Sequence, residues 1–229
     1  MNSHTNRILL LSGGLDSYIA WHMESKPDCL HIEYNGKYSH RERRVLRRLQ
    51  NVHDDLDVWF TTLPIGQFEH PDAWLPLRNM LFVSIASYYA ETIYLPCQLG
   101  EQELPDRSPE FYSYMSDILT KQWGKPISVI NPVSDMTKQD MVSWYLRQGL
   151  PPSNLLLTYS CYNGKKPCGQ CKACFRWWVA LASNGIKLDP QFVKRIKSWE
   201  GTAQYIKDMT SGKYQEKRAE QTLQFLLSN

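Results

Sequence analysis

Short apolar runs alternate with amphipathic segments along residues 8–148. Five runs of strand length are rich in apolar, β-branched and aromatic residues: 8–11, 29–34, 58–63, 93–97 and 127–130. The segments between them place apolar residues three or four positions apart and predict helices over 15–23, 41–49, 79–91, 110–123 and 137–148. Because strands that alternate with helices form parallel sheets, the pattern predicts an α/β fold with a doubly wound parallel sheet.

The remaining segments are predicted to be loops and a helical C-terminal region. Residues 64–77 contain three prolines and no clear periodicity, and residues 98–109 are mostly polar. Both are expected to be loops near the strand ends. Residues 188–229 show two helical stretches of mixed charge. We therefore expect an α/β domain over 7–150 and a separate C-terminal region over 151–229.

The sharpest break in the pattern lies between the first strand and the first helix. Ser12 is followed by Gly13 and Gly14, and the helix opens with Asp16 and Ser17 in its first turn. Glycines here let successive backbone N–H groups point into one concavity at the positive end of the helix, where an anion is stabilised. The turn matches neither the P-loop nor the GxGxxG pattern. The simpler alternative is a glycine-rich turn in which Asp16 and Ser17 only cap the helix.

Composition narrows the classes of function. The chain has 229 residues and a net charge of +3, which is too small to imply a polyanionic partner. Five arginines on the predicted helix 41–49 suggest a nucleic-acid surface, but a solvated helix face balanced by nearby aspartates explains them better. No apolar segment approaches the length of a membrane span and residues 1–6 are polar, so we expect a cytoplasmic protein without a membrane partner.

Four of the six cysteines are clustered, and their spacing is typical of a metal site. Gly164, Pro167 and Gly169 supply tight turns between them, and the pattern C-x6-C-x2-C-x2-C comprises Cys161, Cys168, Cys171 and Cys174. Four thiolates suit tetrahedral Zn²⁺, and a closed four-sulfur shell indicates a structural metal. An iron–sulfur cluster and buried free thiols are the alternatives. Cys29 and Cys97 lie on predicted strands and are expected in the core.

The turn and the cysteine cluster together resemble a known family. The string SGGLDS over 12–17 looks like the signature of PP-loop ATP pyrophosphatases. Joined to this cysteine cluster, it resembles the 7-cyano-7-deazaguanine synthases of queuosine biosynthesis. The ATP stretch of that family is similar to residues 11–21, and its two cysteine-bearing segments are similar to 158–164 and 168–174. Its Pro-x-Arg-Asn helix entrance resembles 76–79, and its late lysine-bearing helix resembles 137–138.

The resemblance implies a fold and an activity. The fold would be of the PP-loop or HUP-like Rossmann type, with a PP-loop ATP pyrophosphatase domain over 7–150 and a zinc-binding helical module over 151–229. The enzyme would adenylate 7-carboxy-7-deazaguanine with ATP and convert it with ammonia, through the amide, to the nitrile. Mg²⁺ and Zn²⁺ are the implied metal ions.

The resemblance also implies which residues form the site. The turn 12–17 would hold the departing pyrophosphate, Asp16 would bind Mg²⁺ directly or through water, and Ser17 would belong to the catalytic set. Arg78 and Lys138 would offset charge on the phosphates or on the substrate carboxylate; otherwise Arg78 pairs with an acidic residue and Lys138 is an ordinary first-turn residue. The implied nucleotide contacts are Leu11, Ser12, Gly13, Gly14, Leu15, Asp16, Ser17, Tyr18, Ile19, Ala20 and Trp21, and the implied zinc ligands are Cys161, Cys168, Cys171 and Cys174.

Two segments depart from the family pattern. Residues 33–37 are altered, and residues 95–111 keep only Pro105, Asp106, Glu110 and Phe111 in place. Glu101 and Glu103 add negative charge in the second segment. We expect this charge to favour a cationic or amine-bearing acceptor.

Several functions therefore stay open. The first is the nitrile-forming synthase, with the deazapurine acid and ammonia as substrates. The second is a ligase that couples the acid to another amine, such as an amino group of a protein acceptor or partner. The third is a tRNA-modifying PP-loop enzyme, but no RNA-binding segment is evident and we do not expect a nucleic-acid partner. A non-enzymatic binding module would leave SGGLDS without a use. We also expect a homodimer.

Overall fold

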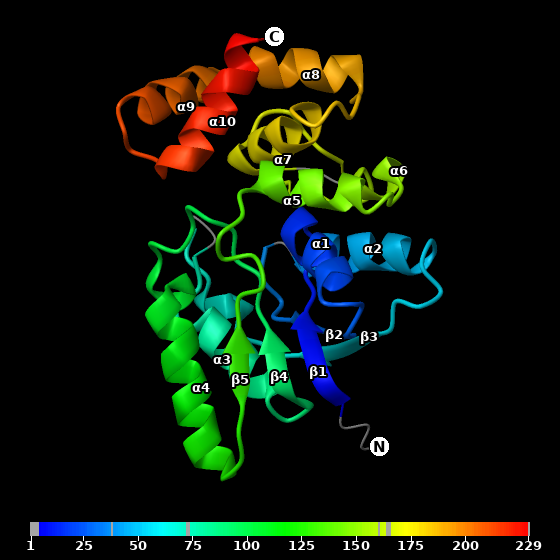
Figure 1. Ribbon diagram of the computed structural model, residues 1–229, viewed down its shortest axis with the longest axis vertical. Helices are drawn as coiled ribbons and strands as arrows, with labels where there is room; N and C mark the ends of the chain where they lie inside the picture. Colours follow the sequence, from blue (N-terminus) through cyan, green and yellow to red (C-terminus); the bar gives the residue numbers. More distant parts are fainter. Residues whose placement is uncertain (1–4, 38, 72–73, 160, 164–165, 229) are drawn as a thin grey trace.

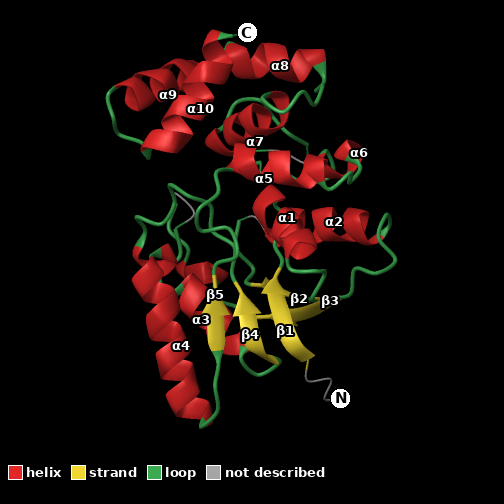
Figure 2. Ribbon diagram, in the orientation of Figure 1, coloured by secondary structure: helices red, strands yellow, loops and turns green. Residues whose placement is uncertain are grey.

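One sheet of parallel strands forms the centre of the protein. The structure is a computed structural model that describes residues 5–37, 39–71, 74–159, 161–163 and 166–228. The strands are β1 (Thr5–Leu10), β2 (Asp28–Glu33), β3 (Val58–Thr62), β4 (Ala90–Tyr94) and β5 (Ser128–Ile130). They pair in the order β3-β2-β1-β4-β5, and every pairing is parallel (Figures 1 and 2). The predicted doubly wound parallel sheet is confirmed.

Helices cover both faces of this sheet because alternate side chains of each strand point to opposite faces. Leu9 on β1 faces a core built with α1 (Leu15–Met23), α2 (Ser39–Gln50) and α5 (Lys138–Arg147). Ile8 and Leu10 face a second core, which is built with the helices α3 (Arg78–Ala86) and α4 (Pro109–Trp123). The strand order changes direction between β1 and β4, which is where doubly wound folds place a ligand.

The C-terminal region is helical and shares a core with the α1 side of the sheet. It contains α6 (Pro152–Leu155), α7 (Lys172–Ala182), α8 (Pro190–Lys197), α9 (Glu200–Thr210) and α10 (Glu216–Leu227). Figure 1 shows these helices beyond α5 and α1, away from the strands. Trp178 and Phe175 on α7 belong to the same apolar cluster as Leu9 and Tyr18. The proposed division of the chain at residue 150 stays a prediction.

Two predicted elements are wrong in extent. The helix predicted over 79–91 ends at Ala86, and β4 begins at Ala90. The apolar spacing continues past the true end of the helix, but parallel pairing of Ala90 with Thr5 draws the chain into the sheet. The described residues of the segment predicted as two helices, 188–228, form three helices. Gly212, with φ of +76°, lies between α9 and α10, where a left-handed backbone ends a helix.

The other elements agree with the sequence pattern within a few residues. The described residues of the loop 64–77, which are 64–71 and 74–77, contain one short 3₁₀ turn, η1 (Gly66–Phe68), and a second, η2 (Pro105–Arg107), lies in the loop 98–109. Thr137 caps α5 in a capping box with Asp140, as predicted. No helix in the described part of the chain is long and apolar enough to cross a bilayer.

Candidate functional site

A cavity of about 220 Å³ lies at the carboxyl ends of β1, β2 and β4. This is the position that the predicted fold assigned to a ligand. Its walls come from β1 and the turn that follows it, from β2, from the start of α3, and from the segments after β4. The residues that line it include Leu11, Ser12, Gly14, Leu15, Asp16, Ser17, Tyr34, Glu42, Arg78, Phe82, Cys97, Glu101, Arg107 and Lys138.

The turn between β1 and α1 is held by its own serines. The Ser17 hydroxyl donates to the carbonyl of Gly14 (3.1 Å) and accepts from the Ser12 N–H (3.3 Å). The Ser12 hydroxyl accepts from the Gly14 N–H (3.3 Å). Gly14 is the N-cap residue of α1 and supplies no side chain to cap it. The first backbone N–H groups of α1 therefore have no acceptor within the helix. They can donate hydrogen bonds to an anion bound in the cavity.

Gly13 lets this turn lie close to α2. Its φ is +76°, a left-handed conformation that side-chain-bearing residues rarely adopt. A Cβ at this position would lie 2.9 Å from Cγ1 of Val45 on α2. The glycine is required both by the backbone angle and by the packing of the neighbouring helix.

Asp16 and Lys138 meet across the cavity. The ammonium of Lys138 donates to both carboxylate oxygens of Asp16, and the two side chains are only 17% and 20% exposed, respectively. Lys138 is the first residue of α5, behind the Thr137 cap, so α1 and α5 both point their N-termini at the cavity. Two helix N-termini and one lysine concentrate positive potential on a bound anion.

The predicted nucleotide stretch 11–21 divides into two parts. Leu11, Ser12, Gly14, Leu15, Asp16 and Ser17 line the cavity. The side chains of Tyr18, Ile19, Ala20 and Trp21 are instead buried in the core behind it. The Tyr18 hydroxyl, for example, is hydrogen-bonded to Nε2 of His53 (2.7 Å) and to the hydroxyl of Tyr145 (3.2 Å).

Arg78 also reaches the cavity, where its charge is not neutralised by an ion pair among the described residues. It begins α3, directly after Leu77, whose φ is +60°. Its Nε donates to Oδ1 of Asn79 at 3.4 Å, and Asn79 in turn donates to the carbonyl of Asp106 (3.1 Å). These contacts join the start of α3 to the loop 98–109.

Glu101 is the centre of a buried ion network. Its carboxylate accepts from Arg107 (2.6 Å), from Arg176 on α7 (2.6 Å) and from the amide of Gln98 (2.7 Å). Burial raises the pKa of Glu101, but Arg176, Lys138 and Arg107 outweigh that effect and hold it at about 2. Two arginines already neutralise Glu101, so its charge is not available to attract a cationic acceptor, and the nature of the acceptor stays a prediction. Glu103 is exposed and does not line this cavity.

A second cavity of about 230 Å³ adjoins the first. Both cavities are lined by Leu15, Asp16, Glu101, Arg107 and Lys138. The second also takes Tyr162, Ala173, Arg176 and Trp177, which belong to the cysteine-bearing segment and α7. The C-terminal region thus completes one wall of the site.

Two residues that line the cavity were not predicted to belong to the site. They are Glu42, which had no predicted role, and Cys97, which was expected in the core on a predicted strand. Cys97 is buried, but it lies beyond the end of β4 and lines the cavity. Its backbone N–H donates to Oδ1 of Asn131 (3.0 Å), and its carbonyl accepts from Nδ2 of Asn131 (2.7 Å). Burial raises the pKa of its thiol to about 12, so it is a neutral thiol. Glu42 lies among the arginines of α2, so the pattern of charges along the sequence did not mark it as a site residue.

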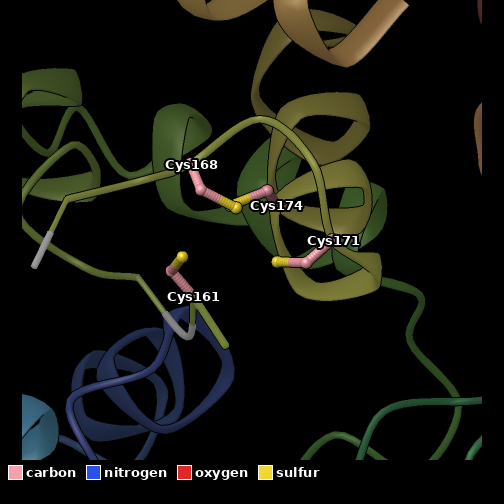
Figure 3. A group of neighbouring side chains, drawn as sticks. All are labelled: Cys161, Cys168, Cys171 and Cys174. Carbon is pink, nitrogen blue, oxygen red and sulfur yellow. The ribbon is translucent and has the colours of Figure 1, made fainter. Parts of the chain in front are cut away.

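The four clustered cysteines converge as the spacing predicted. Figure 3 shows Cys161, Cys168, Cys171 and Cys174 with their sulfurs facing one central point, and all four sulfurs lie within 4.8 Å of one another. The sulfurs of Cys168 and Cys174 are 3.9 Å apart. A tetrahedral zinc with Zn–S bonds of about 2.3 Å needs sulfurs about 3.8 Å apart, so the donor set fits Zn²⁺. Gly164, one of the predicted turn residues, lies outside the described residues.

Backbone contacts hold this cluster against both parts of the chain. The N–H groups of Asn163 and Gln170 donate to the sulfurs of Cys161 (3.4 Å) and Cys168 (3.3 Å), respectively. Arg41 on α2 donates to the carbonyl of Cys161 at 2.6 Å, which gives one of the five α2 arginines a structural role. Cys171 caps α7 and Cys174 lies in its first turn, where the helix dipole favours thiolates.

Removing one cysteine ligand should destabilise the whole C-terminal region. Cys171→Ser should reduce bound zinc well below one ion per chain and lower the melting temperature by about 10 °C or more, because metal binding contributes to folding free energy. Elemental analysis and calorimetry measure both. Cys29→Ala, a buried cysteine outside the cluster, should keep the zinc content. A stable wild-type protein that purifies with iron or without metal would contradict the zinc assignment.

Neutralising Glu101 should cost about 2–3 kcal/mol of folding free energy, because Glu101→Gln leaves Arg107 and Arg176 without their shared counter-charge. Since folding lowers the pKa of Glu101 from 4.5 to about 2, the stabilisation is complete above pH 4.5 and declines as the pH falls toward 2. Denaturant unfolding of wild type and variant between pH 3 and 7 measures the difference. A difference that does not shrink in acid would show that the charge is not its source.

Comparison with known proteins gives one family. A model described as "Queuosine biosynthesis protein QueC" matches residues 62–185, a range that includes Arg78, Lys138 and the four cysteines but begins after the SGGLDS turn. The 7-cyano-7-deazaguanine synthase of Sulfolobus acidocaldarius is 30% identical over 80% of this chain and 47% of that protein. The enzyme of the same name from Trichormus variabilis is 29% identical over 82% of this chain and 99% of that protein.

The chain thus spans about half the length of the Sulfolobus relative and nearly all of the Trichormus relative. A solved NMN synthetase from Francisella tularensis is 14% identical, covering 86% of this chain and 84% of that one, with a TM-score of 0.42. That likeness is too distant to bear on function. The family model covers more than half of the chain, and this protein belongs to the QueC family.

Proposed function

We propose that this protein is an ATP-dependent 7-cyano-7-deazaguanine synthase. One observation carries the proposal. Asp16 and Lys138 form an ion pair where the N-termini of α1 and α5 face the cavity, and Arg78, which has no ion-pair partner among the described residues, lines the same cavity. Such a site stabilises the charge that develops when ATP is cleaved between its α- and β-phosphates. Family membership supports the deazapurine acid as the second substrate.

The proposed reaction uses two adenylations. A carboxylate oxygen of the substrate attacks the α-phosphorus of ATP, and pyrophosphate leaves toward the turn 12–17. Ammonia then displaces AMP from the acyl adenylate, which gives the amide and releases a proton. The amide oxygen attacks the α-phosphorus of a second ATP, which again releases pyrophosphate. Loss of AMP and of the two protons on nitrogen then leaves the nitrile. Adenylation is needed because a carboxylate or amide oxygen is a poor leaving group, whereas AMP is a good one.

The turn 12–17, Lys138, Arg78 and Asp16 have separate tasks in this scheme. The turn residues from Ser12 to Ser17 bind the departing pyrophosphate through backbone N–H groups. Lys138 moves its ammonium from Asp16 to the phosphates, and Arg78 offsets the charge of the substrate carboxylate or of the α-phosphate. The freed Asp16 carboxylate is a suitable ligand for Mg²⁺, directly or through water, and the ion would neutralise phosphate charge.

The acceptor side favours ammonia over a larger amine. Glu101 and Glu103 supply the negative charge expected to favour an amine-bearing protein acceptor, but Glu101 is neutralised by Arg107 and Arg176, and Glu103 lines neither cavity. The net charge around the second cavity is positive, which does not attract an ammonium-bearing partner. The ligase that couples the acid to another amine therefore lacks its electrostatic support.

Product analysis tests the activity. Incubation with ATP, 7-carboxy-7-deazaguanine and ammonium should give the amide and then the nitrile, with two AMP formed for each nitrile. Mass spectrometry and nucleotide chromatography measure the products. Adenylation that stalls before the nitrile until another amine is added would favour the ligase instead, and no adenylation of the acid would refute both functions.

Asp16→Asn should abolish formation of AMP and pyrophosphate, by a factor of about 10³ or more, because Mg²⁺ loses a ligand and Lys138 loses its counter-charge. The fold should persist, since Asn keeps the size of the side chain. Asp54→Asn, at an exposed position outside both cavities, is the matched control and should keep full turnover. Near-normal turnover in the Asp16 variant would exclude this residue from the mechanism.

A further inference from the structure

Glu42 is a partly buried carboxylate that lines the main cavity and has no hydrogen-bond or ion-pair partner among the described residues, although the charge of Arg78 acts on it. It lies on α2 and lines the main cavity together with Tyr34 and Arg78. Its carboxylate makes no hydrogen bond or ion pair with any residue that the structure describes. Withdrawing an unpaired carboxylate from water is unfavourable, so a protein that keeps one beside a cavity is expected to use it on a ligand.

The other carboxylates of the two cavities are already occupied. Both oxygens of Asp16 accept from Lys138. Glu101 accepts from Arg107 and Arg176. Among the described residues that line either cavity, Glu42 is thus the carboxylate with free acceptor capacity.

The surroundings of Glu42 suit a flat aromatic ring. Tyr34 and Phe82 line the same cavity, with ring centroids 6.0 Å apart and planes inclined by 56°. The Tyr34 hydroxyl is fixed by donating to Glu69 at 3.3 Å, which holds the ring in place. A planar base can contact these rings while one of its edges faces Glu42.

The edge of the base decides whether a carboxylate is a favourable partner. A guanine-type base presents its N1–H and its 2-amino group side by side as donors, and a carboxylate accepts from both in a bidentate arrangement. Adenine presents the lone pair of N1 at that edge, which repels a carboxylate. A base with a keto group but no 2-amino group offers only one donor.

We propose that Glu42 determines specificity for the substrate by accepting hydrogen bonds from the N1–H and 2-amino groups of the deazaguanine ring. This inference rests on the proposed function, which supplies a guanine-type acid as substrate. It assigns to α2 a binding role beyond its packing against Gly13 and Cys161.

The protonation of Glu42 supplies a second signature. Burial raises the pKa of this carboxyl to about 7, while Arg78 of α3 lowers it and Glu69 of the loop 64–77 raises it. Tyr34, the other titratable group beside it, has its own pKa raised and stays neutral. Only the ionised carboxylate accepts both hydrogen bonds, so affinity for the acid should increase about tenfold from pH 6 to pH 8.

Calorimetric binding tests the proposal without turnover. The full chain, saturated with α,β-methylene-ATP, is titrated with 7-carboxy-7-deazaguanine and with its counterpart that lacks the 2-amino group. Wild type should bind the first acid about 30-fold more tightly or better, since one charge-assisted hydrogen bond is lost with the second. Glu42→Gln should reduce that preference to within about threefold and flatten the pH dependence.

Controls separate the possible failures. Glu103→Gln removes an equal charge from an exposed position and should keep the preference, and binding of α,β-methylene-ATP by Glu42→Gln should be unchanged, which reports the fold. If wild type binds the two acids equally, or Glu42→Gln keeps the preference, the inference is wrong while the proposed function stands. If Glu42→Gln loses nucleotide affinity instead, Glu42 contacts ATP and the inference is also wrong. If wild type binds neither acid, the proposed function itself is refuted.

Discussion

The contact between Asp16 and Lys138 joins the two parts of the chain that make the site. The two residues are 122 positions apart, yet their side chains meet because α1 and α5 pack together with their N-termini at the same edge of the sheet. Helix N-termini that converge on one point create an anion site only if nearby carboxylates are neutralised. Lys138 does this for Asp16.

The C-terminal region contributes to the same edge through arginines. Arg176 of α7 binds Glu101, and Arg218 of α10 donates to the carbonyl of Gly100 at 3.3 Å. These two side chains hold the loop 98–109, whose sequence departs from the family pattern. The cysteine cluster fixes the start of α7 and hence the position of Arg176. The cysteine cluster thus contributes to the geometry of the loop that lines both cavities.

The three acidic groups of the main cavity illustrate how environment assigns different tasks to similar side chains. Asp16 is paired with Lys138, and the arginines and lysine around Glu101 hold its pKa at about 2. Glu42 has the same functional group, but burial without a partner brings its pKa to about 7. Each state follows from the neighbours that other elements supply, because partners and solvent exposure control the cost of a buried charge.

The sequence by itself determined the strands, most helices, the turn 12–17 and the four cysteine ligands, because each depends on residue types at short fixed spacings. It misplaced the end of α3 and merged helices of the C-terminal region, since apolar periodicity does not record where a strand pairs or where a left-handed residue ends a helix. Only the tertiary structure decided which carboxylates of the cavity are paired with cations and which are not. The partner of Glu101 on α7 is 75 residues away, and the isolation of Glu42 depends on which side chains of other elements fail to reach it.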